Sequence, residues 1–73
     1  MNYEELMENL NDAFGQWCYD NDRGYTQEQL DRFLETAEQR IEEIMTGGLD
    51  TQEAYDMYLD EINDVIEYLM GEE

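Results

Sequence analysis

Residues 20–31, DNDRGYTQEQLD, contain three aspartates whose spacing raises the question of a calcium site. Asp20, Asp22 and Asp31 stand where positions 1, 3 and 12 of an EF-hand loop would fall. Calcium prefers oxygen ligands, and a twelve-residue loop between two helices is a common way of collecting them. The three carboxylates could therefore bind the ion if the other positions of the loop also fit.

The remaining positions of this segment do not fit a calcium loop. The motif requires an oxygen ligand at position 5, glycine at position 6 and a bidentate glutamate at position 12. Positions 5 and 6 are Gly24 and Tyr25 here, and moving Gly24 to position 6 would place Tyr19 at position 1. Thr26 is a strong helix N-cap, which would end the loop early. The segment therefore predicts a turn between two helices, with no metal ligands.

Catalytic side chains are scarce in this chain. It contains no histidine to act as a base near neutral pH, no serine or lysine nucleophile, and no glycine-rich phosphate loop. Paired carboxylates alone could cleave glycosides or hold a metal, but a domain of 73 residues has little room for a substrate cleft. We therefore expect a protein that is not an enzyme and uses no cofactor.

Three parts of the chain repeat apolar residues at intervals of three and four, which is typical of amphipathic α-helices. No part alternates apolar and polar residues as a strand would, and no proline interrupts the repeats. The residues expected to cap or end the helices are Asn2, Tyr19, Thr26, Gly47, Gly48, Asp50 and Gly71. Short connections between such helices predict an all-α fold, a compact antiparallel three-helix bundle forming one domain over residues 1–73.

The apolar faces of these helices should pack together in the core. The expected inner residues are Tyr3, Leu6, Met7, Leu10, Ala13, Phe14, Trp17 and Cys18 in the first helix, Leu30, Phe33, Leu34, Ala37, Ile41, Ile44 and Met45 in the second, and Tyr55, Tyr58, Leu59, Ile62, Val65, Ile66 and Leu69 in the third. We expect Cys18 to be a small buried hydrophobe rather than a reactive thiol.

Acidic residues dominate the charge of the chain. There are 21 Asp and Glu residues against three Arg, so the formal net charge is −18, while hydrophobic residues make up 41% and argue against disorder. The first residues lack the basic and apolar regions of a signal peptide, and no apolar run approaches the roughly 20 residues of a transmembrane helix. We therefore expect a cytoplasmic protein without a membrane anchor. The sequence leaves a homodimer open.

The carboxylates of the second and third helices fall into two rows on helical wheels drawn at about 100° per residue. The 28–42 stripe consists of Glu28, Asp31, Glu35, Glu38 and Glu42, and the 53–67 stripe consists of Glu53, Asp56, Asp60, Asp64 and Glu67. Each stripe occupies an arc of about 80° and extends about 21 Å along its helix. The sequence therefore predicts two long, regular rows of negative charge.

The uniform sign of these charges needs an explanation beyond helix solubility. Opposite charges four residues apart stabilise a helix by about 0.2–0.5 kcal/mol, and like charges destabilise it by similar amounts. This chain has no lysine, and only Arg32 and Arg40 are expected to pair with nearby carboxylates. Because folding alone does not favour such a surface, we expect the stripes to bind a partner.

A DNA duplex presents a similar negative surface, since it carries one negative charge per roughly 1.7 Å of its axis. In size, charge and lack of catalytic groups, the whole chain resembles the small acidic DNA-mimic inhibitors of bacteriophages, which include anti-restriction and many anti-CRISPR proteins. That class shares no common motif, so it assigns no residue here. The resemblance implies a basic nucleic-acid-binding partner, a CRISPR effector or restriction nuclease, in the host bacterial cytoplasm, and no direct binding of nucleic acid.

Three further residues, Met57, Glu61 and Tyr68, complete the expected partner-binding surface. Met57 and Tyr68 lie beside the 53–67 stripe, with Glu61 between them, and Tyr19 similarly leaves the apolar face of its helix. Single exposed apolar residues are common on protein surfaces. Tyrosine and methionine are nevertheless enriched in interface cores, where they would add selectivity to charge.

Two other interpretations of the acidic surface stay open. The chain could be an acidic adaptor or an antitoxin-like module that neutralises another basic protein. It could also be adapted to high salt, which favours acidic surfaces poor in lysine and predicts a domain that unfolds at low salt.

Overall fold

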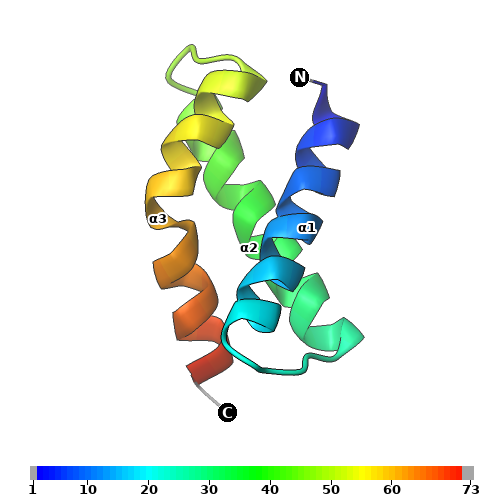
Figure 1. Cartoon of the computed structure of the whole chain (residues 1–73). Helices are drawn as coiled ribbons and strands as arrows, with labels where there is room; N and C mark the ends of the chain where they lie inside the picture. Colours follow the sequence, from blue (N-terminus) through cyan, green and yellow to red (C-terminus); the bar gives the residue numbers. More distant parts are fainter. Residues whose placement is uncertain (1, 72–73) are drawn as a thin grey trace.

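The computed structural model describes residues 2–71 and contains three helices: α1 (Tyr3–Asp20), α2 (Gln27–Met45) and α3 (Thr51–Gly71). Figure 1 shows α1 and α3 running in the same direction, with α2 antiparallel to both. The bundle measures 36 × 20 × 20 Å, and its described part contains no strand. The prediction of an all-α three-helix bundle is confirmed.

Each helix begins at a side chain that accepts a backbone hydrogen bond from the first helical turn. The three accepting residues are Asn2, Thr26 and Asp50. At α2 the bonding is reciprocal, because the Thr26 N–H donates to Gln29 Oε1 at 2.7 Å while the Gln29 N–H donates to Thr26 Oγ1 at 3.2 Å. Such caps satisfy backbone groups that have no partner within the helix. All three predicted helix starts are therefore confirmed.

The two connections reverse the chain by different means. After α2, Gly48 takes a φ of +98°, a backbone conformation that residues other than glycine rarely adopt. After α1, Asp22 takes a φ of 54°, and the Arg23 N–H donates to the carbonyl of Cys18 at 2.8 Å. Residues 27–31 belong to α2, so the aspartate-rich segment is a turn followed by a helix, as predicted.

The core consists of one row on each helix, with successive buried residues four apart. The rows are Leu6, Leu10, Phe14 and Cys18 on α1, Phe33, Ala37 and Ile41 on α2, and Ala54, Tyr58, Ile62, Ile66 and Met70 on α3. Residues four apart form the ridges by which helices interlock. The Phe14 ring stacks on Phe33 and makes an edge-to-face contact with Tyr25, each at a centroid distance of 5.0 Å.

The prediction of the α3 inner face was wrong at Leu59, whose side chain is 42% exposed, and it omitted Ala54 and Met70, which are buried. Four residues advance a helix by about 400°, so a row of residues four apart drifts by about 40° at each step. The drift brings Ala54 and Met70 into the core at opposite ends of α3 and leaves Leu59 at the margin. Tyr3, also expected inside, is 45% exposed at the start of α1.

Candidate protein-binding surface

The 28–42 stripe lies along the outer side of α2. Glu28, Asp31, Glu35 and Glu42 are exposed, whereas Glu38 is half-buried. Glu38 lies beside α1, where burial and hydrogen bonding to Glu38 raise the pKa of the Tyr3 hydroxyl to about 12. One flank of this stripe therefore borders the start of α1.

The 53–67 stripe runs along α3, opposite the buried row of that helix. All five of its carboxylates, Glu53, Asp56, Asp60, Asp64 and Glu67, are exposed. The two stripes do not merge. The opposite flank of α2 carries Thr36 and Arg40, which face α3 and separate the stripes.

Glutamine side chains hold three aspartates by hydrogen bonds within single helices. Gln16 donates to Asp20 at 2.9 Å, and two equivalent bonds, from Gln27 to Asp31 at 2.9 Å and from Gln52 to Asp56 at 3.1 Å, hold members of the stripes. Each donor stands four residues before its acceptor, a spacing that stabilises helices. A neutral donor positions the carboxylate without cancelling its charge. The four-residue spacing behind these bonds is present in the sequence and is a signal by which they can be predicted.

Arginine cancels little of the acidic charge. In the part of the chain from residue 2 to residue 71, the one ion pair joins Arg40 Nε to Glu61 Oε1 at 2.8 Å, and this bond raises the pKa of the Arg40 guanidinium. The expected local pairing of Arg40 is thus confirmed, with its partner on α3. Arg23 instead donates to the carbonyl oxygen of Met70 at 3.1 Å, near the end of α3. Glu61, which the sequence predicted to contact a partner protein, is half-buried and already paired with Arg40.

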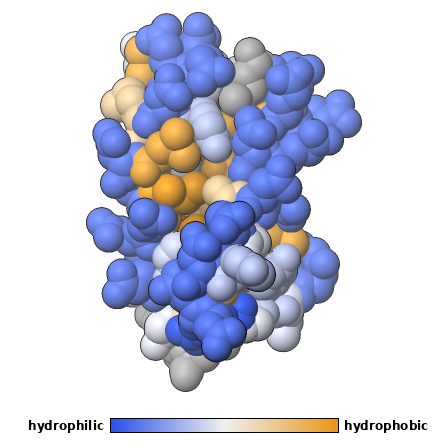
Figure 2. Space-filling model, viewed as in Figure 1, coloured by the Kyte–Doolittle hydropathy of each residue, from blue (hydrophilic) through white to orange (hydrophobic). Residues whose placement is uncertain are grey.

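The apolar residues expected on the surface are exposed. Met57 is 50% exposed, Tyr68 65% and Tyr19 83%. Tyr19 lies near the end of α1, beside the connection to α2. Figure 2 shows one face of the molecule, hydrophilic over most of its area, with an apolar patch at mid-height.

A groove lies between α2 and α3, next to the 53–67 stripe. The sequence did not predict it. Its volume is about 350 Å³, and its lining residues are Thr36, Glu61, Asp64, Val65, Tyr68 and Leu69. Val65 and Leu69 are only partly buried against the core, so they leave an apolar surface in the groove. No single-helix pattern could reveal this groove, because its two walls belong to different helices.

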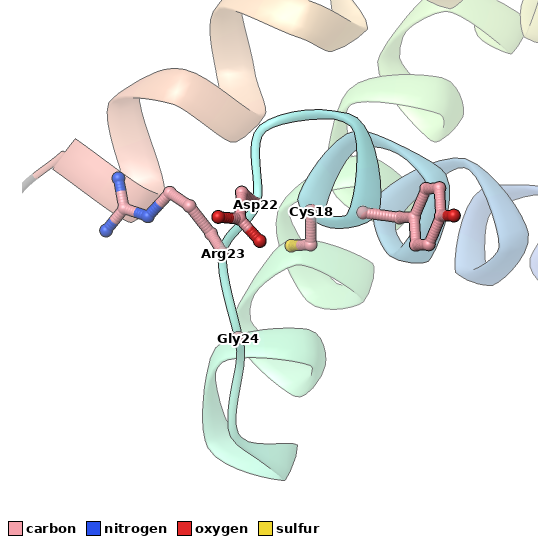
Figure 3. A pocket seen from close by; sticks show the side chains of 5 residues that line it. Cys18, Asp22, Arg23 and Gly24 are labelled. Carbon is pink, nitrogen blue, oxygen red and sulfur yellow. The ribbon is translucent and has the colours of Figure 1, made fainter.

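A second hollow lies at the connection between α1 and α2. It has a volume of about 540 Å³ and is lined by Cys18, Tyr19, Asp22, Arg23 and Gly24. Figure 3 shows Arg23 extending from the connection toward the end of α3. The Cys18 thiol is buried as predicted, and burial raises its pKa, an effect that Arg23 partly opposes. The contacts of Arg23 and Cys18 thus hold the connection against the bundle.

No known protein family, curated protein or solved structure matches this chain. None of the helices formed by residues 2–71 is both long and apolar enough to span a membrane.

Proposed function

We propose that this protein is a DNA-mimic inhibitor. It binds the basic nucleic-acid-binding groove of a bacterial defence nuclease, a CRISPR effector or a restriction enzyme, and so blocks access of DNA. The observation that supports this proposal is the pair of stripes on α2 and α3, nine of whose ten carboxylates are exposed while none is in an ion pair within residues 2–71.

The stripes have the regularity that a DNA-binding groove recognises. Successive carboxylates stand three or four residues apart, which corresponds to about 4.5–6 Å along a helix axis. The phosphates of DNA also form regular rows of negative charge, and proteins that bind DNA obtain much of their affinity from them. Because the helices and the glutamine bonds position these charges before binding, docking loses less entropy than it would for a flexible acidic tail.

Inhibition then needs no chemistry. The charge of −18 steers the protein toward a basic groove and speeds the encounter. Once bound, the bundle occupies the space that the DNA duplex would take, so inhibitor and DNA exclude each other. This exclusion separates the proposal from an acidic adaptor, which would bind a basic protein without competing for its DNA site.

The test is affinity capture from lysates of bacteria with active CRISPR and restriction systems. The immobilised protein is compared with a control in which Glu35, Asp60 and Glu67 are replaced by lysine. We expect one nuclease or effector to be retained by the natural chain alone and to be released by excess duplex DNA. A retained protein that salt releases and DNA does not would contradict mimicry and favour the adaptor.

A circular-dichroism series in increasing salt tests the remaining interpretation. We expect the helices to be formed at low salt and to melt at somewhat higher temperature as screening weakens the repulsion between carboxylates. A domain that folds only in concentrated salt would instead indicate adaptation to a saline environment.

A further inference from the structure

The groove between α2 and α3 combines an apolar floor with an unequal distribution of charge. Val65 and Leu69 supply the apolar surface, and Tyr68, 65% exposed, stands at its edge. Asp64 lies on the α3 wall, and the neighbouring carboxylates of the 53–67 stripe continue that wall outward. The groove therefore offers apolar contact directly beside concentrated negative charge.

The α2 wall has the opposite character. Thr36 lines the groove, and Arg32 and Arg40 stand one helical turn before and after it, on the same flank of α2. Arg40 reaches across to Glu61 on α3 and neutralises that carboxylate. A ligand in the groove consequently meets Thr36 and the paired Arg40 on its α2 side, and the carboxylate of Asp64, which is in no ion pair in the described part of the chain, on its α3 side.

Charge and size together restrict the occupant. A second copy of this chain would also carry a charge of −18, so self-association would bring like charges together. A volume of about 350 Å³ stands at the lower end of the roughly 300–1,000 Å³ typical of small-molecule sites, and it suits one large side chain. The wall of carboxylates calls for basic neighbours on that side chain.

We propose that the groove binds one large apolar side chain from a basic polypeptide segment, whose flanking lysine or arginine residues contact the carboxylates of α3. An arginine in this position could also lie over the ring of Tyr68, since guanidinium groups favour aromatic faces. The proposal rests on the proposed function, because it names the part of a basic partner that this surface selects. Charge would attract many basic proteins, and the groove would choose among them.

The test uses two synthetic peptides of equal length and charge, rich in lysine and arginine, which differ in one central residue. One carries phenylalanine there and the other serine. We expect the phenylalanine peptide to bind the full chain about tenfold more tightly at physiological ionic strength, as expected when a large apolar side chain is buried. Amide NMR shifts should then concentrate at Thr36, Val65 and Leu69.

Matched variants locate the effect. Val65→Thr keeps the shape of the groove floor while making it polar, and it should remove most of the difference between the peptides. Leu59→Ser removes an exposed apolar residue of α3 outside the groove and should leave that difference unchanged. Tyr68→Ser, at an exposed position, provides a second groove variant if Val65→Thr does not fold.

The outcomes separate this inference from the proposed function. Equal affinity for both peptides, or a preference that survives Val65→Thr and Tyr68→Ser, would overturn the groove inference. Shifts at the groove residues caused by raising the concentration of the chain alone would also overturn it, in favour of a second copy. The competition with DNA would remain intact in each case, and only its failure bears on the proposed mimicry.

Discussion

The inner and outer faces of α2 are shaped by different requirements. Phe33 and Ile41, on the inner face, are fully buried and interlock with the other helices. Glu35 and Glu42, on the outer face, are exposed, and no ion pair within the described residues involves them. The inner face needs side chains whose shapes fit the neighbouring helices, whereas the outer face needs only polar side chains to keep the helix soluble. The proposed role in binding would explain why its stripe is restricted to a single charge sign.

The largest effect on stability should come from the inner face. Phe14→Ala removes a ring that stacks on Phe33 and meets Tyr25, at a position with no exposed surface. We expect a loss of about 3–5 kcal/mol, measured by urea unfolding. Leu59→Ala, at the exposed margin, should cost less than about 1 kcal/mol. Similar losses at the two positions would contradict the core described here.

The outer face should respond in the opposite way. We expect lysine at positions 35, 60 and 67 together to weaken partner binding by about a thousandfold, since like charges then meet across the interface. The free energy of unfolding should stay constant or rise by about 1 kcal/mol, because each lysine gains carboxylate neighbours three or four residues away. Glu38 is left unchanged because Tyr3 bonds to it. A triple variant that unfolds, or that binds normally, would break the distinction between the faces.

A smaller effect concerns Tyr58, the one inner residue of the described chain with a buried side-chain oxygen that lacks a hydrogen-bond partner. We expect Tyr58→Phe to raise the free energy of unfolding by about 1 kcal/mol at neutral pH, because a buried unpaired hydroxyl is costly. Urea unfolding of the two proteins measures this difference. A large loss would mean that the hydroxyl has a stabilising partner.

The same hydroxyl also predicts a dependence on alkaline pH. Burial, reinforced by the charge of Glu61, raises the pKa of Tyr58 to about 12, so the folded protein holds the proton more tightly than the unfolded chain. The stability that the folded protein gains from holding this proton is fully present below about pH 10 and is lost as the pH rises from about 10 to 12. Tyr58→Phe should reduce this fall in stability, while the raised pKa of Tyr3 leaves part of it in place.

The smallest effect should come from the glutamines that support the stripes. Gln27→Ala and Gln52→Ala each remove one bond to an aspartate four residues later, and each should lower stability by about 0.2–0.5 kcal/mol. Partner binding should weaken slightly, because Asp31 and Asp56 then keep their charge but lose their fixed position. Titration of the captured partner measures this change, and Gln16→Ala, outside both stripes, is the matched control.

The sequence predicted the features of this molecule that depend on neighbouring residues. Helix starts at Asn2, Thr26 and Asp50 follow from local hydrogen bonding, and the left-handed turn at Gly48 follows from the freedom of glycine. The exposure of the stripes likewise follows from their place opposite the apolar faces.

The apolar and charged patterns of single helices could not predict features that depend on how the helices pack against one another. The drift of the buried row, which exposes Leu59 and buries Met70, appears only when three helices interlock. The partner of Arg40 on α3 and the floor of the groove at Val65 likewise require knowledge of which flanks face each other. The sequence alone therefore reveals the local features of each helix better than the features formed between helices.

Equilibrium competition tests the central claim of DNA mimicry most directly. A fluorescent DNA duplex is titrated into the captured partner at several fixed concentrations of this protein. Mimicry predicts that the apparent dissociation constant of the duplex rises linearly, without a plateau, as the concentration of the protein increases, and that no complex contains both. A dissociation constant that reaches a plateau, or a complex of partner, duplex and this protein together, would contradict the claim.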